Sequence, residues 1–137
     1  MVSQAAGVIL VLPDGRWVMQ RRTDDAPTSP GQLSFFGGSL EPGETFEQAA
    51  RRELQEETSL KVEDLVFEFA CNITLPPDKN GIGPIEAVIY RIAIPKGDFK
   101  VYEGQGAEAY TLEELKLRKD SSDVVHVVLE TLFGGSR

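Results

Sequence analysis

The beginning of the chain alternates between short apolar runs and turn-forming residues. Residues 8–12 are apolar and partly β-branched, and they end at the turn sequence 13–15, which reads Pro-Asp-Gly. A second apolar segment follows at residues 17–21. Short apolar runs bounded by Pro, Asp and Gly favour strands, and two runs across so short a turn favour a hairpin. We therefore expect an antiparallel pair at the start of the chain.

The middle of the chain repeats this pattern with longer segments. Residues 62–70 contain Val66 and Phe69 in partial alternation, and residues 85–94 form the clearest strand pattern in the sequence. The stretch between them, residues 76–84, is rich in Pro, Gly, Asp and Asn, which favour turns over regular structure. We expect a second antiparallel pair joined by a long loop.

Helical spacing replaces strand alternation after Thr45. This residue forms a capping-box pattern with Gln48, so a helix should begin near residue 46, and it should end near Ser59. Four apolar residues recur at helical intervals and should face the core: Phe46, Ala49, Ala50 and Leu54.

Two further helices are predicted towards the C-terminus. Thr111 and Glu114 form another capping-box pattern, which opens a short helix to about Leu117. Ser122 or Asp123 would cap a final helix. Its apolar face would comprise Val124, Val127, Val128 and Leu132. Strands and helices in this succession place the chain in the α/β (α+β) class.

Composition is that of an ordinary globular chain. With 137 residues, 41% hydrophobic and 26% charged, the chain is most simply one domain spanning residues 1–137. Its net charge of −8 argues against binding to a nucleic-acid polymer, whose backbone needs a basic surface. The apolar run at residues 5–12 is too short to span a bilayer, so we expect no membrane association.

Cysteine and histidine are too few for several kinds of site. Cys71 is the only cysteine and His126 the only histidine, which excludes an intrachain disulfide and a His/Cys zinc site. Together with the absence of a basic leader, this favours a reducing, cytoplasmic location. His126 falls off the apolar stripe of the final helix, so we interpret it as a surface residue, with contact to a bound base as the alternative.

The stretch 38–60 concentrates acidic residues. It contains six glutamates and two arginines, and so carries half of the net charge of −8. At about 100° per residue, Glu56 and Glu57 project within about 60° of Glu53 on the predicted helix. Carboxylates this close repel one another, and a cation between them would relieve the repulsion. A solvated acidic face is the alternative interpretation.

Oxygen ligands of this kind suit Mg²⁺, with Mn²⁺ as a second possibility, and such ions usually bind substrate phosphates as well. Gly37 and Gly38 precede the helix and would let a ligand or ion approach closely, or simply form a tight turn. Of Arg21 and Arg22, at most one would reach the site, because neighbouring side chains of a strand point to opposite faces. A solvated strand end is the other interpretation of this pair. The combination predicts metal-assisted attack on a phosphate ester or anhydride.

The full spacing of the stretch resembles the Nudix box of the Nudix hydrolase family. The pattern is G-x5-E-x7-R-E-U-x-E-E-x-x-U, where U is apolar, and eight of nine defining positions agree over 23 residues. The agreeing residues are Gly38, Glu44, Arg52, Glu53, Leu54, Glu56, Glu57 and Leu60. The segment from Glu103 to Leu115 also resembles the later region in which many members carry another site carboxylate.

This resemblance implies a fold and a metal site. The Nudix fold is an α/β/α sandwich with a mixed β-sheet between helices. Glu53, Glu56 and Glu57 would bind the divalent metal, with Glu103 and the carbonyl of Gly37 as further ligands.

Catalytic and substrate-binding roles are implied as well. Glu53 or Glu103 would be the general base, and Arg52 would orient a box glutamate. Arg22 matches a phosphate-contacting position in MutT-type members, and Gly38 would border the substrate. A nucleoside pocket would be lined by Phe35 and by the strands 66–72 and 85–90.

The activity implied is Mg²⁺-dependent hydrolysis of a nucleoside diphosphate linked to another moiety. A nucleoside triphosphate, oxidised ones included, cleaved to a monophosphate and pyrophosphate, is the first choice. An ADP-ribose or nucleotide-sugar pyrophosphatase is the alternative, because Pro76 resembles a marker of ADP-ribose members. A non-catalytic nucleotide-binding module is the third possibility, disfavoured because all three box carboxylates and Glu103 are kept. Both a monomer and a homodimer are compatible with the sequence.

Ser59 departs from the box. The family usually has a glycine there, which ends the helix in a left-handed conformation. We expect either a cost of about 1 kcal/mol at Ser59 or a different end to the helix.

Overall fold

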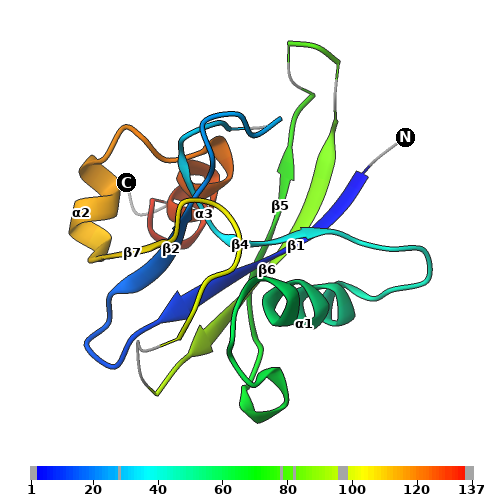
Figure 1. Cartoon of the computed structure of the whole chain (residues 1–137). Helices are drawn as coiled ribbons and strands as arrows, with labels where there is room; N and C mark the ends of the chain where they lie inside the picture. The colour runs from blue at the N-terminus through cyan, green and yellow to red at the C-terminus, as the bar shows by residue number, and fades with distance from the viewer. Residues whose placement is uncertain (1–2, 28, 78, 82, 96–98, 135–137) are drawn as a thin grey trace.

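The computed structural model describes residues 3–27, 29–77, 79–81, 83–95 and 99–134, and it contains a mixed sheet with helices on both faces (Figure 1). The strands are β1 (Ser3–Val11), β2 (Trp17–Arg21), β3 (Leu33–Ser34), β4 (Phe36–Ser39), β5 (Glu68–Leu75), β6 (Ile85–Ala93) and β7 (Ala107–Tyr110). The helices are α1 (Phe46–Glu57), α2 (Leu112–Leu117) and α3 (Asp123–Phe133), with a 3₁₀ turn, η1, at Val62–Asp64. The predicted α/β/α sandwich with a mixed β-sheet is confirmed. Within the described residues, every helix is too short or too polar to cross a membrane.

Strand β1 organises the sheet because it has partners along both edges. On one edge it pairs in parallel with β6 over its whole length. On the other edge it pairs antiparallel first with β4, through residues 5–8, and then with β2, through residues 10–11. The sheet order is β3-β2-β1-β6-β5, with β7 added against β2. The predicted β1–β2 hairpin and the antiparallel β5–β6 pair are both present.

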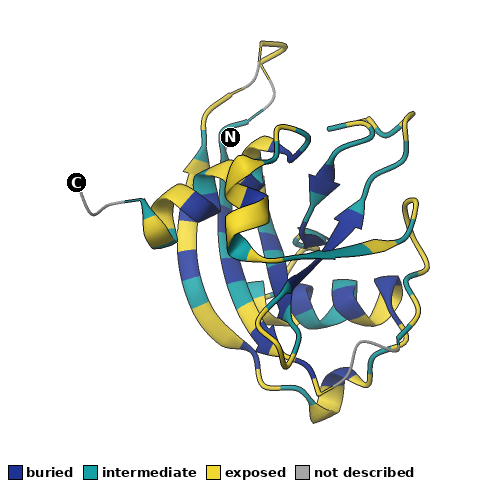
Figure 2. Cartoon of the chain, turned by 90° about the vertical axis from the view of Figure 1, so that its left-hand side faces the viewer, coloured by how far each residue is buried: buried dark blue, intermediate teal, exposed yellow. Residues whose placement is uncertain are grey.

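Successive residues of β1 feed two separate apolar cores. Val8 and Leu10 pack on the side of α1, whereas Ile9 packs with Met19 on the side of α3. Because both faces of the strand are covered, its sequence reads as an unbroken apolar run rather than an alternation. Figure 2 shows the buried residues along the strands and on the side of α1 that faces them.

The predicted strand at 62–70 is wrong in its first half. Residues 62–64 form η1, closed by hydrogen bonds from Asp64 N to Lys61 O and from Leu65 N to Val62 O. Strand β5 begins only at Glu68 and continues to Leu75. Val62 is buried in the core beside α1, so its burial reflects packing of a turn and not of a strand.

Helix boundaries follow the capping signals closely. Thr45 and Thr111 make the predicted reciprocal capping boxes. Helix α1 ends at Glu57, before the predicted Ser59, and Phe46 is only half-buried. The residues of α3 that are buried are Val125, Val128 and Leu129; the predicted Val124, Val127 and Leu132 lie at the edges of that stripe, half-buried.

Arg21 ties three distant segments together. Its guanidinium donates to both carboxylate oxygens of Glu108 on β7 at 2.7 and 2.8 Å. It also donates to Asp120, between α2 and α3, at 2.9 Å, and Arg118 bonds Asp120 at 2.8 Å. The hydrogen bonds from Arg21 lower the pKa of Glu108 to about 2. This cluster fixes the end of β2 to the elements that follow β6.

Replacing Glu108 by Gln should flatten the acid side of the stability curve. The pKa of Glu108 is lowered from its usual 4.5 to about 2, so the ion pair stabilises the fold fully above about pH 4.5 and loses this effect as the pH falls towards 2. We expect Glu108→Gln to cost about 1 kcal/mol near neutral pH, discounted because a third of the carboxylate is exposed, and little once the pH is below about 2. Urea unfolding across this pH range measures the difference.

The control is Glu63→Gln, which changes an exposed carboxylate on η1. It should alter the unfolding free energy little at any pH. A difference between wild type and Glu108→Gln that stays constant with pH would contradict the prediction.

Candidate functional site

The three predicted carboxylates of α1 lie in different environments. The side chain of Glu56 is 57% exposed and that of Glu53 is 19% exposed, while Glu57 retains only 3% of its surface. This gradient follows from the helix geometry, because Glu57 lies on the edge of the stripe that packs against β4. A carboxylate so deeply buried needs a specific partner.

The backbone of β4 supplies that partner. The N–H of Gly37 donates to Glu57 Oε1 at 2.9 Å. Burial, against the opposing effect of the Gly37 N–H and together with the negative charges of Glu53 and Glu103, nevertheless raises the pKa of Glu57 to about 8. Burial also raises the pKa of Glu53. The carboxylates therefore form a crowded, electrostatically unfavourable group.

Arg52 neutralises the outer part of this group. It donates to Glu53 at 3.0 Å and to Glu56 at 2.9 Å. It also makes a two-pronged contact with Glu44, at 2.7 and 2.9 Å, and reaches the carbonyl of Ser39 at 3.0 Å. The contact between Arg52 and box glutamates that the resemblance implied is thus present in the structure.

Close packing requires glycine at the first of the two glycines of β4, Gly37. Gly37 has φ of +138°, and a Cβ there would lie 2.1 Å from the carbonyl oxygen of Ala6 on β1. At Gly38, a Cβ would lie 2.6 Å from Glu53 Oε1. Of the two interpretations of this pair, the structure favours close approach over a plain turn, since Gly37 and Gly38 lie within a strand.

Glu103 reaches the site from the segment between β6 and β7. It is exposed, and it lies close enough to Glu57 for the two carboxyl groups to share a hydrogen bond. The N–H of the preceding residue, Tyr102, donates to the carbonyl of Glu57 at 2.7 Å. The structure therefore brings Glu103 to the box carboxylates, as the sequence predicted.

Arg21, the last residue of β2, and Arg22, which follows the strand, have different surroundings. Arg21 is held by Glu108 and Asp120, away from the carboxylates. Arg22 lines a hollow of about 180 Å³ that also contains Gly37 and Gly38. It lines a second hollow, of about 220 Å³, together with Glu103. Of the two arginines, it is therefore Arg22 that lies beside Gly37, Gly38 and Glu103.

The 180 Å³ hollow has a mainly apolar lining. Its apolar side chains are Ala5, Ala6, Phe35, Phe36, Leu75, Ile85, Ala87, Ile89 and Val124. Residues of the strand 85–90 line it and none of residues 66–72 does; on β5 the lining residue is Leu75. Val124 was expected to face the core. Its role at the hollow could not be anticipated, because α3 meets β5 only in the folded chain.

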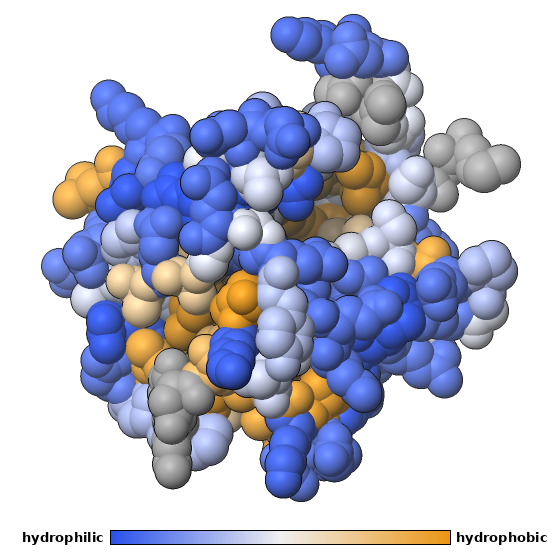
Figure 3. Space-filling model, viewed as in Figure 1, coloured by the Kyte–Doolittle hydropathy of each residue, from blue (hydrophilic) through white to orange (hydrophobic). Residues whose placement is uncertain are grey.

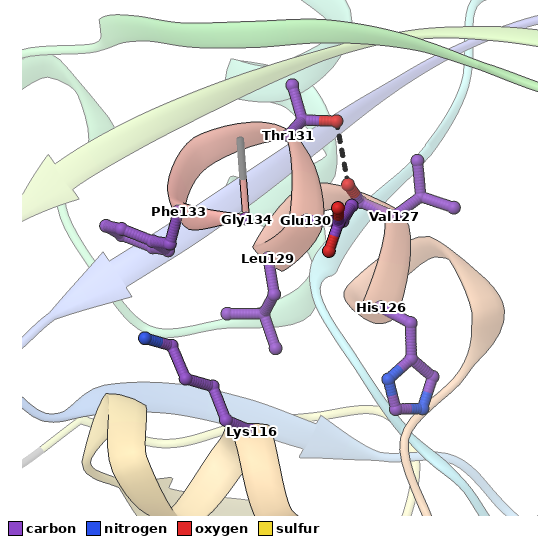
Figure 4. A pocket seen from close by; sticks show the side chains of 8 residues that line it. All are labelled: Lys116, His126, Val127, Leu129, Glu130, Thr131, Phe133 and Gly134. Carbon is purple, nitrogen blue, oxygen red and sulfur yellow. Dashed lines mark hydrogen bonds between the residues drawn. The ribbon is translucent and has the colours of Figure 1, made fainter. Parts of the chain in front are cut away.

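Two larger hollows lie against α3. One of about 570 Å³ shares Arg22, Leu75 and Val124 with the apolar hollow and adds Asp123 and His126 from α3. Figure 3 shows a recess with an apolar floor between α3 and β5, rimmed by hydrophilic side chains. Another, of about 620 Å³, lies along the outer side of α3, where Figure 4 shows Lys116, Phe133 and the exposed His126. It contains none of the box carboxylates, so size alone does not locate the chemistry.

The donor set fits a hard divalent cation, although the donors do not yet converge. Carboxylate oxygens of Glu53, Glu56, Glu57 and Glu103 are the ligand type that Mg²⁺ and Mn²⁺ prefer. Among the residues that the structure describes, no three Asp, Glu, His or Cys side chains are already grouped to hold a metal. Arg52 instead donates to one oxygen of Glu53 and one of Glu56.

Comparisons with known proteins agree with this geometry. The family model of the NUDIX domain matches residues 1–129. The nucleoside triphosphatase NudI of Escherichia coli O1:K1 is 44% identical over 48 residues, which cover 35% of this chain and 34% of that protein's length. The MutT protein of Methanosarcina mazei Go1 superposes with a TM-score of 0.82 at 18% identity, covering 96% of this chain and 92% of that one.

A further solved structure contains a nucleotide and a metal. It is a bifunctional NMN adenylyltransferase/ADP ribose pyrophosphatase from Francisella tularensis, complexed with AMP and a Mn ion. It superposes with a TM-score of 0.71 at 20% identity and covers 96% of this chain and 42% of that one. At these identities the structural likeness establishes the fold.

Adding a methyl group at Gly37 should destabilise the protein strongly. The new Cβ would collide with backbone atoms of Ala6 and would require a left-handed conformation that alanine disfavours. We expect Gly37→Ala to cost at least about 3 kcal/mol of unfolding free energy, measured by urea denaturation. Gly43→Ala is the matched control, since Gly43 also has positive φ but open space around it, and it should cost only about 1 kcal/mol. Equal costs at both positions would contradict the packing explanation.

Proposed function

The chain belongs to the NUDIX domain family, the family of the Nudix hydrolases, and from this premise we propose that it cleaves the phosphoanhydride of a nucleoside diphosphate linked to another group. The preferred substrate is a nucleoside triphosphate, oxidised ones included, cleaved to a monophosphate and pyrophosphate. The reaction requires Mg²⁺, and Mn²⁺ is a second candidate. The name of the relative NudI, a nucleoside triphosphatase, supports the triphosphate choice.

The position of Arg22 is the observation that carries this proposal. Arg22 borders both the apolar hollow, with Phe35 and Gly38, and the smaller hollow that contains Glu103. A nucleotide with its base in the apolar hollow would direct its phosphates past this guanidinium towards the carboxylates. Guanidinium groups match phosphate oxygens well, because their donors form a planar fork.

The carboxylates would serve as metal ligands, and one of them would also be the general base. Glu53, Glu56, Glu57 and Glu103, with the Gly37 carbonyl, would hold the metal, which supplies charge neutralisation at the phosphates and a more acidic bound water. Either Glu53 or Glu103 would accept the proton of the attacking water. Arg52 would keep Glu53 and Glu56 aligned, since it already contacts both.

A second substrate class has its own support. The Francisella tularensis neighbour is named as an ADP ribose pyrophosphatase, and Pro76 lines the 570 Å³ hollow beside Arg22. ADP-ribose and nucleotide sugars share the same phosphoanhydride, so the same carboxylates would serve them. A non-catalytic nucleotide-binding module is the remaining alternative.

The lone Cys71 supports a reducing, cytoplasmic location.

A substrate panel with product identification tests the proposal. Purified protein with Mg²⁺, and separately with Mn²⁺, is assayed on nucleoside triphosphates, oxidised triphosphates, ADP-ribose and GDP-sugars. We expect a monophosphate and pyrophosphate from at least one triphosphate. Turnover of only ADP-ribose or nucleotide sugars would transfer the proposal to the second class. Binding of nucleotides without any turnover would support the non-catalytic module instead.

Replacing the carboxyl groups of the box should abolish turnover. Glu56→Gln and Glu57→Gln each replace a metal-binding oxygen and should lower kcat at least about 100-fold. Glu47→Gln is the matched control on the same helix, because Glu47 pairs with Arg51 at 3.0 Å outside the carboxylate group. It should retain activity. Wild-type rates in both Glu56→Gln and Glu57→Gln would refute the assignment of the site.

A further inference from the structure

The end of α1 has a feature that the proposed function does not use. No left-handed residue ends the helix: Thr58, the C-cap, is extended, with φ of −137°, and Ser59 has no positive φ. The hydroxyl of Thr58 donates to the carbonyl of Leu54 at 2.8 Å and accepts from the N–H of Leu60 at 3.2 Å. The helix thus ends differently at the position where the box usually has glycine.

The chain then pairs at once with the segment that carries Glu103. Thr58 and Val101 form an antiparallel bridge. The N–H of Ser59 donates to the carbonyl of Lys100 at 3.0 Å, and the N–H of Lys100 donates to the hydroxyl of Ser59 at 2.8 Å. The N–H of Tyr102 donates to the carbonyl of Glu57 and completes this group of hydrogen bonds. This short ladder fixes residues 100–102 to the end of α1.

The residues that follow Glu103 are fixed as well, in this case to Arg21 and Arg22. The backbone N–H of Gln105 donates to the carbonyl of Arg21 at 2.7 Å, and its side chain donates to the carbonyl of Arg22 at 2.9 Å. Gly104 lies so close to β2 that a Cβ would be 2.4 Å from the carbonyl oxygen of Arg21. Glu103 therefore lies between two fixed points, one on α1 and one on β2.

We infer that Ser59 is a positioning residue for Glu103, through the hydrogen bond that its hydroxyl accepts from the N–H of Lys100. The inference rests on the proposed function, in which Glu103 serves the site. Most of the ladder uses backbone atoms, which any residue at this position would provide. The hydroxyl is the one side-chain contribution from Ser59, and a glycine at this position could not make it.

Ser59→Gly and Ser59→Ala test the inference by removing the hydroxyl. One lost neutral hydrogen bond corresponds to a factor of about 2 to 12, so we expect kcat to fall about threefold to tenfold with KM nearly unchanged. Ser59→Thr keeps a hydroxyl and should retain most of the activity. Thr131→Ala is the matched control, because it removes one exposed hydroxyl that donates to the carbonyl of Val127 on α3 (Figure 4).

The double variant with Glu103→Ala separates positioning from general loosening. If Ser59 acts through Glu103, Ser59→Gly should not lower kcat further once Glu103 is Ala. The same proportional loss in both backgrounds would overturn the inference, as would unchanged kcat in Ser59→Gly and Ser59→Ala.

Amide hydrogen exchange provides a readout that does not depend on turnover. Ser59→Gly and Ser59→Ala should raise the exchange rates of the Lys100 and Tyr102 amides about threefold to tenfold, whereas Thr131→Ala should leave them unchanged. If wild type hydrolyses nothing in the substrate panel, the proposed function fails, and these exchange rates still decide whether Ser59 holds the segment. Unchanged exchange in both variants would overturn the inference.

Discussion

The burial of Glu57 is the constraint on which the candidate site depends. A carboxylate that keeps almost none of its surface in water is tolerated here because a backbone N–H of β4 meets it. That contact requires β4 and α1 to approach closely, so that a Cβ at Gly38 would already meet the carboxylate of Glu53. The small residues Ala49 and Ala50 make the same approach possible from the helix side.

The crowding that results is balanced by a single guanidinium. Arg52 contacts Glu44, Glu53 and Glu56 together, and so connects the loop before the helix with two of its later turns. Charges of one sign are costly at this spacing unless a cation shares them. Arg52 is thus the group that keeps these carboxylates together on one face of α1.

Local signals in the sequence predicted the elements and the box well, because both depend on residues close together in the chain. Capping at Thr45 and Thr111 involves partners three residues away, and the carboxylate stripe follows from helix geometry alone. The prediction was wrong for residues 62–67, where a 3₁₀ turn at Val62–Asp64 and an irregular segment precede β5. It also could not anticipate the pairing of Arg21 with Glu108, which lie 87 residues apart and meet only because β7 adds to β2.

Strand β1 pairs with most of the elements that carry the candidate site. Its first half pairs with β4, which meets the carboxylates, its second half pairs with β2, which leads to Arg22, and its full length pairs with β6. A shift of one residue in the register of β1 would turn its side chains from each core to the opposite face of the sheet. It would also displace β4, which meets the carboxylates, from β2, which leads to Arg22. The site is therefore assembled only when the sheet is assembled. In a chain whose β1 is not paired in this register, the carboxylates of α1 are present but are not positioned relative to β4 and Arg22.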